Sequence, residues 1–131
     1  MIDKTDLRKL AKARLRDAQI LMQSKRYDGA IYLCGYVIEL GLKIRICKTL
    51  KWTGFPQTNS EFQNYKSFKT HNLDVLLTLS GIEEKVKNQY FAEWSFVNLW
   101  NPESRYNLVG SISSQDARNM LSSAEKLLKI M

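Results

Sequence analysis

The sequence predicts an all-α fold, and three observations lead to that prediction. Apolar residues recur at spacings of three and four in several segments, only six Gly and two Pro interrupt the 131 residues, and no run alternates long enough to require a strand. A chain of this length buries roughly two-thirds of its unfolded surface in one core. We therefore expect a single domain, residues 1–131, built as an up-and-down bundle of four principal helices plus a short helix.

The first part of the chain predicts two long helices. Residues 6–24 carry an apolar side that follows Thr5 as N-cap and Asp6 in the first turn. Residues 28–50 are apolar around most of the helix circumference, which predicts the central helix of the bundle. Three glycines of this helix lie six residues apart: Gly29, Gly35 and Gly41. Each allows a neighbouring helix to approach closely, at a cost of about 1 kcal/mol relative to Ala.

The rest of the chain predicts a loop and three helices. Residues 51–69 lose periodicity and gather Gly, Pro, Thr, Asn and Ser, so we expect a long loop that holds a short helix or a lid. Helices are expected over 70–81, with Gly81 as the stop, over 82–100, and over 113–131. Five aromatic residues of the loop are expected to cover the end of the core or a dimer partner, with base binding as the alternative: Trp52, Phe55, Phe62, Tyr65 and Phe68.

The net charge of +7 is concentrated in the first two helices. Residues 1–51 hold twelve Lys and Arg against five Asp and Glu, whereas residues 52–131 hold eight against eight. Four of the cations recur every four residues and form a stripe along the first helix: Lys4, Arg8, Lys12 and Arg16. The stripe is either a solvated face or a surface that meets RNA phosphates or an acidic partner.

Several classes of protein are not expected. The longest apolar run is interrupted by Glu39 and is too short to cross a bilayer, and the first residues lack the pattern of a signal peptide, so the cytoplasm is the expected location. Cys34 and Cys47 lie thirteen residues apart on one helix, so we expect two reduced, buried thiols. One His and two distant Cys do not make a metal site, and no cofactor is expected.

Four segments, in this order and at this spacing, resemble the HEPN domain family of prokaryotic helical bundles. They are ArgLeuArgAspAla at 14–18, ArgTyrAspGlyAlaIle at 26–31, GlyTyrValIleGluLeuGlyLeuLysIle at 35–44 and ThrHisAsnLeuAspValLeuLeu at 70–77. The most specific pieces are Glu-x-x-x-Lys at Glu39 and Lys43, and His-x-Leu-x-x-Leu beginning at His71.

The resemblance implies a bundle of four or five helices that forms homodimers. Family members occur in bacterial toxin–antitoxin, abortive-infection and other defence loci, often beside a minimal nucleotidyltransferase that acts as a partner. Active members are metal-independent ribonucleases with an Arg-x(4 to 6)-His motif, in which the arginine holds the scissile phosphate and the histidine takes part in acid-base cleavage.

This sequence departs from that motif. Arg105 is the arginine nearest the expected site, and neither Arg105 nor Arg118 is followed by a histidine. Acid-base cleavage near neutral pH needs a group that titrates there, and His71 is the only histidine. We therefore expect a module that acts mainly by association, as a homodimer or with a nucleotidyltransferase-type partner, and not a ribonuclease.

The alternative is an RNA-cleaving or nucleotide-binding toxin component. Its candidate catalytic residues are Arg105, His71 and Glu39, and its candidate nucleotide- or RNA-binding residues are Arg105, Tyr106, Lys43, Arg8, Lys12 and Arg16. Arg105 would bind a phosphate, with Tyr106 or Trp100 stacking on a base, or else Arg105 pins its loop to the bundle through a carboxylate.

Glu39 and His71 each have two readings. A carboxylate in a central helix needs a cationic or imidazole partner, and Lys43, Arg105 and His71 are the candidates. Glu39 is then either a structural partner inside the bundle or the group that orients Arg105 or His71 at a pocket. His71 at its helix start either caps the helix and fixes the long loop or serves as an acid-base group.

Overall fold

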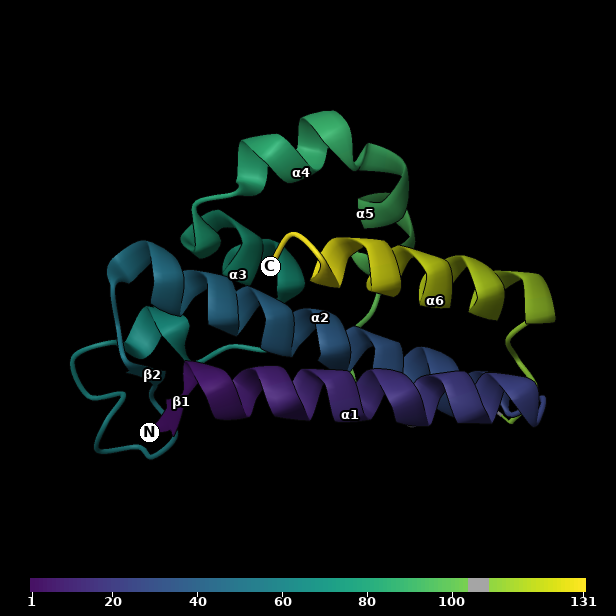
Figure 1. The fold of residues 1–131 in the computed structure, drawn as a ribbon, viewed down its shortest axis with the longest axis horizontal. Coiled ribbons are helices and arrows are strands. Elements are labelled where there is room, and N and C mark those ends of the chain that lie inside the picture. Colours follow the sequence, from purple (N-terminus) through teal and green to yellow (C-terminus); the bar gives the residue numbers. More distant parts are fainter. Residues whose placement is uncertain (104–108) are drawn as a thin grey trace.

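The computed structural model describes residues 1–103 and 109–131, and it is mostly helical (Figure 1). In chain order the elements are β1 (Ile2–Asp3), α1 (Lys4–Gln23), α2 (Tyr27–Leu50), β2 (Gly54–Phe55), the short 3₁₀ helix η1 (Lys66–Phe68), α3 (Leu73–Ser80), α4 (Glu83–Gln89), α5 (Phe91–Val97) and α6 (Ser114–Leu128). The prediction of a predominantly helical chain is confirmed.

Helix α2 is the central helix, as its sequence predicted. It packs against α1, α3 and α6, and in Figure 1 it runs between α1 and α6. Its fully buried apolar side chains come from all around the helix: Ala30, Cys34, Val37, Ile38, Leu42, Ile44, Ile46 and Cys47. Burial of each larger aliphatic side chain is worth about 1.5–3 kcal/mol, so α2 contributes a large share of the driving force for folding.

Helix α1 begins earlier than the sequence predicted. The side chain of Asp3 accepts a hydrogen bond from the backbone N–H of Asp6 at 2.8 Å, so Asp3 and not Thr5 is the N-cap. Asp3 lies in extended backbone at the end of β1, and this conformation aims its carboxylate at the free N–H groups of the first turn.

A two-stranded antiparallel sheet joins the start of the chain to the long loop, and the sequence did not predict it. Ile2 pairs with Phe55 and Asp3 pairs with Gly54. Strands of two residues are too short to produce an alternating pattern. The pairing holds the 51–69 segment against the ends of α1 and α2.

The aromatic residues of the 51–69 segment cover one end of the core, as predicted. Phe55 and Phe62 are buried, and Trp52 packs edge-on or tilted against Phe55, Tyr65 and Phe68 at centroid distances of 5.0–6.2 Å. Of the two alternatives for this segment, a short helix or a lid, the structure contains a short helix, η1.

The predicted single helix over residues 82–100 is wrong, because the structure divides it at Tyr90 into α4 and α5. Tyr90 has φ −129° and ψ 32°, which is not helical backbone. Helix α4 contacts α3, whereas α5 contacts α6. The break lets the chain contact both α3 and α6, which one straight helix would not do. The indole of Trp94 in α5 also donates a hydrogen bond to Asp74 of α3 at 3.2 Å.

The predicted stop of α3 and the predicted cap of α6 are confirmed, whereas α3 begins at Leu73 and not at Thr70, and α6 ends at Leu128 and not at Met131. Gly81 follows α3 with φ 81°, the left-handed conformation that favours glycine. Ser113 caps α6 by accepting a hydrogen bond from the N–H of Asp116 at 3.1 Å.

Among the three glycines of α2, Gly35 allows the closest approach, and the group that approaches is the side chain of Trp100 and not a neighbouring helix. A Cβ atom at this position would lie 2.1 Å from ring atoms of Trp100. The indole of Trp100 is 7% exposed and donates to the backbone oxygen of Tyr32 at 3.2 Å. The segment that follows α5 is therefore anchored on α2 by one large side chain.

Candidate functional site

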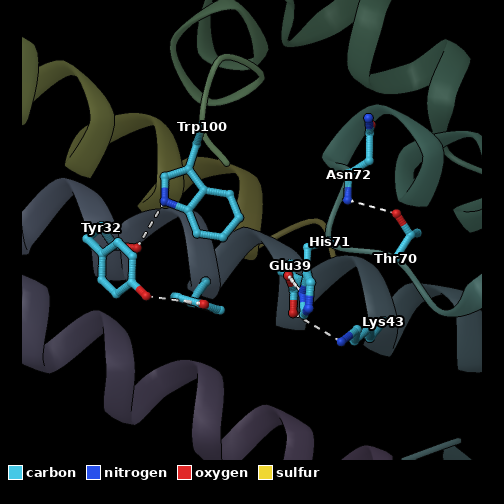
Figure 2. Close-up of polar contacts among 8 residues, drawn as sticks. Tyr32, Glu39, Lys43, Thr70, His71, Asn72 and Trp100 are labelled. Atoms are coloured by element: carbon cyan, nitrogen blue, oxygen red, sulfur yellow. Dashed lines mark hydrogen bonds and ion pairs between the residues drawn. The ribbon is translucent and has the colours of Figure 1, made fainter. Parts of the chain in front are cut away.

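The buried carboxylate of Glu39 lies at the centre of the candidate site, and Figure 2 shows its two partners. Lys43 Nζ is 3.0 Å from Oε2, and His71 Nδ1 is 2.7 Å from Oε1. Glu39 is 3% exposed. The prediction that this acid pairs with Lys43 or His71 is confirmed for both partners, whereas Arg105 lies outside the described residues.

Two separate pieces of chain build this cluster. Glu39 and Lys43 are one helical turn apart on α2, so the helix itself places them on the same face. His71 comes from the segment that leads into α3. Its position is fixed by the next residue, since Asn72 caps α3 through Val75 N–H at 3.1 Å and donates its own N–H to Thr70 Oγ1 at 3.0 Å. Asn72, and not His71, is thus the cap.

The hydrogen bonds give the imidazole one free nitrogen. A carboxylate accepts and does not donate, so Nδ1 of His71 carries the hydrogen that it shares with Glu39. Nε2 forms no hydrogen bond within the described part of the chain, and the His71 side chain is 62% exposed. An imidazole that is oriented by a carboxylate and open at Nε2 can accept a proton or bind a polar ligand atom.

The basic stripe of α1 lines a separate surface groove of about 360 Å³. Lys4, Arg8 and Lys12 of α1 lie there with Lys48 of α2, and no Asp or Glu lines the groove. The pKa of Lys48 is lowered by burial and then by the positive charges of Arg8, Arg45 and Lys4. The cations that line the groove are Lys4, Arg8, Lys9, Lys12 and Lys48, and they exceed the anions there because no acid lines it.

The structure thus separates residues that the sequence grouped together. Arg8 and Lys12 line the groove, Arg16 lies exposed one turn beyond it, and Lys43 belongs to the Glu39 cluster. Arg105 and Tyr106 lie outside the described residues. Trp100 is buried against Gly35 and is not available to stack on a base.

Sequence reasoning missed Lys48 as a groove residue. Lys48 follows Ile44 by four residues on α2, and both line the groove, but this spacing does not show which face of α2 meets α1. The concentration of positive charge in residues 1–51 was the available signal.

The two cysteines are free and buried, as predicted. Burial raises the pKa of the Cys34 thiol to about 12, with Glu125 as a smaller cause, and burial also raises the pKa of Cys47. Both thiols are therefore protonated and poor nucleophiles near neutral pH.

Two further findings concern residues 1–103 and 109–131 only. These residues contain no group of three or more His, Cys, Asp or Glu side chains placed to hold a metal ion. None of the helices there combines the length and the apolar character needed to cross a bilayer.

Comparison of the chain with family models, with curated proteins and with solved structures finds no match.

Proposed function

We propose that this protein is a HEPN-like helical module that acts by association, forming a homodimer through the outward face of α5. That face consists of Phe91, Ala92, Ser95, Phe96 and the adjoining Leu99, which are all exposed. The observation that carries the proposal is the exposure of its large apolar side chains: Phe91 is 69% exposed, Phe96 47% and Leu99 83%.

The spacing of these residues makes them one surface. Positions 91, 92, 95 and 96 follow the i, i+1, i+4, i+5 pattern of one side of α5, and Leu99 lies two residues beyond the end of that helix. The opposite side carries the buried Trp94, Val97 and Trp100. Isolated apolar residues on a surface are normal, but a contiguous group of large ones is typical of a protein–protein contact.

Charge favours a second copy of this chain as the occupant. The face contains no Lys, Arg, Asp or Glu, and the excess of +7 resides in residues 1–51. Two copies that meet through α5 would keep their basic surfaces away from the contact. A two-fold dimer needs a patch that complements itself, and an uncharged apolar stripe satisfies that condition.

The resemblance to HEPN domains also supports a function by association, because it implies homodimers and a nucleotidyltransferase-type partner from a toxin–antitoxin or other defence locus. The missing Arg-x(4 to 6)-His motif argues for association and against ribonuclease activity. A nucleotidyltransferase encoded beside this chain is the partner to co-express first.

Sedimentation equilibrium at tens of micromolar tests the dimer. We expect the natural sequence to sediment as a dimer and the double variant Phe91→Ser/Leu99→Ser as a monomer. Ile20→Ser is the matched control, since Ile20 is also an exposed aliphatic residue but lies on α1. A monomeric natural protein, or a dimer that survives the double substitution, would contradict the proposal.

A second candidate function is RNA binding through the groove between α1 and α2. The excess of cations around Lys48 favours it. Binding of a mixed RNA should weaken steeply with salt, and Arg8→Gln/Lys12→Gln should flatten that dependence, because each lost phosphate contact lowers the slope by about one. Lys85→Gln/Lys87→Gln on α4 is the matched control; equal loss in both variants would remove this candidate.

A further inference from the structure

We infer that the hollow beside His71 binds a small amphipathic anion, with an apolar body inside and one anionic group at the Lys43–Lys69–His71 rim. The hollow measures about 550 Å³. This inference is independent of the proposed association through α5, which lies on other elements.

The walls of the hollow are apolar and come from distant parts of the sequence. Lining side chains are Ile2 of β1, Leu7 and Leu10 of α1, Leu40 of α2, Phe55 of β2, and Phe62 and Phe68 of the following segment. Leu7, Phe55 and Phe62 are buried in the main core. The floor is therefore part of the packed interior, and an apolar ligand body would extend that interior.

The rim carries positive charge that the protein does not neutralise. Lys43, Lys69 and His71 line the hollow, and no Asp or Glu lines it. The nearest acid in this cluster, Glu39, is buried and already bonds Lys43 and His71. Glu39 thus pairs with one of the two ammonium groups that line the hollow.

Lys69 is the cation left over. Its ammonium donates to the side-chain oxygen of Asn59, a neutral group, and it has no carboxylate partner among the residues that the structure describes. Lys43 lies 5.2 Å from the centroid of the Phe55 ring, so the charged rim borders directly on the aromatic floor.

His71 adds a directed polar contact. Because Glu39 holds Nδ1, the ring presents Nε2, which can accept from a neutral acid group or, when protonated, donate to an anion. Among the described residues that line the hollow, Lys69 is the ammonium without a carboxylate partner, so the site fits a single anionic group, whereas polyanions fit the groove of Lys4, Arg8, Lys12 and Lys48 better.

Titration of the full chain with simple probes tests both halves of the inference. Octanoate supplies an apolar body with one anion, 1-octanol lacks the anion, and acetate lacks the body. Amide shifts in two-dimensional NMR would locate and quantify binding. We expect octanoate to shift amides near Phe55 and Lys69 and to bind about tenfold more tightly than either partial analogue, because 1-octanol lacks the charge-assisted hydrogen bond and acetate lacks the apolar body that the hollow would bury.

2-Naphthoate distinguishes an aromatic from an aliphatic body, and tight binding of either anion supports the inference. Failure of both anions to shift these amides, or binding of 1-octanol or acetate as tightly as octanoate, would overturn it.

Two variants assign the binding to this hollow. Lys69→Gln should weaken octanoate binding about threefold to tenfold, whereas Lys66→Gln, which removes an exposed lysine of the same segment that does not line the hollow, should leave it unchanged. Leu10→Trp should fill the half-buried wall and abolish binding. Octanoate affinity that persists in Leu10→Trp, or that falls equally in Lys66→Gln, would also overturn the inference.

Discussion

Helices α2 and α5 both carry large apolar side chains on opposite sides, but α2 buries most of them within the chain, whereas α5 leaves one side exposed. Helix α2 packs against α1, α3 and α6, and the carboxylate of Glu39 near its centre pairs with Lys43 and His71. Helix α5 buries Trp94 and Val97 and leaves Phe91 and Phe96 exposed. An apolar pattern therefore indicates that a helix face is buried by other residues, but it does not show whether those residues belong to the same chain or to a partner.

Disruption of the contact between α2 and Trp100 is expected to change the free energy of unfolding most. Gly35→Ala would bring a Cβ to 2.1 Å from the indole ring, so the ring must leave its site. Overpacking typically costs about 1–3 kcal/mol, and loss of a buried aromatic contact adds to that cost. We expect the free energy of unfolding, from denaturant titration, to fall by about 2 kcal/mol.

Gly29→Ala is the matched control for that substitution. Gly29 is in the same helix, but its added Cβ would meet only the end of the Leu21 side chain, at 3.2 Å. The gain in helix propensity offsets this contact, so a change within about 1 kcal/mol is expected. Equal free energies of unfolding for the two variants would contradict the packing of Trp100 against Gly35.

The Glu39 cluster gives a smaller expected effect. Glu39→Gln leaves the ammonium of Lys43 beside a neutral amide in a largely buried setting. Lys43 keeps some solvent contact and His71 is exposed, so we expect a loss of about 1–2 kcal/mol in the free energy of unfolding.

Asp17→Asn serves as the control for a surface pair. Asp17 lies 2.5 Å from Arg14, with both side chains more than a third exposed. Such pairs contribute about 0.2–1 kcal/mol. An unchanged melting temperature in Glu39→Gln would count against a structural role for this acid.

The outward face of α5 gives the smallest expected effect on the folded monomer. Leu99→Ser should change the free energy of unfolding, measured at a concentration that favours monomer, by less than about 0.5 kcal/mol, because the side chain is 83% exposed. Val97→Ser, two residues earlier and fully buried, should cost about 2 kcal/mol or more. Equal losses would show that Leu99 is packed within one chain.

Features that depend on neighbouring residues were predicted well from the sequence. The caps at Ser113 and Gly81 and the Glu39–Lys43 pair depend on residues within one turn of each other. The break at Tyr90 and the β1–β2 pairing were missed because both depend on neighbours that are distant in sequence. The Thr5 assignment failed for a similar reason, since β1 places Asp3 at the cap.

The candidate sites divide in the same way. Glu39, Lys43 and His71 were named from the sequence, and the structure brings them together. Lys48 and Lys69 were not named, because nothing near them in the chain indicates the groove or the hollow that they line. Arg105 and Tyr106 remain sequence predictions, since they lie outside the described residues.

Local patterns are enough to predict a mostly helical chain, a central helix over residues 28–50 and a partner for Glu39, because helix periodicity and the cost of a buried charge act over a few residues. The pairing of His71 with Glu39, the exposed apolar face of α5 and the apolar hollow with its positive rim depend on how the whole chain packs. These features arise where distant segments meet, and the free energy of such contacts depends on the packed arrangement and not on the pattern of any one segment.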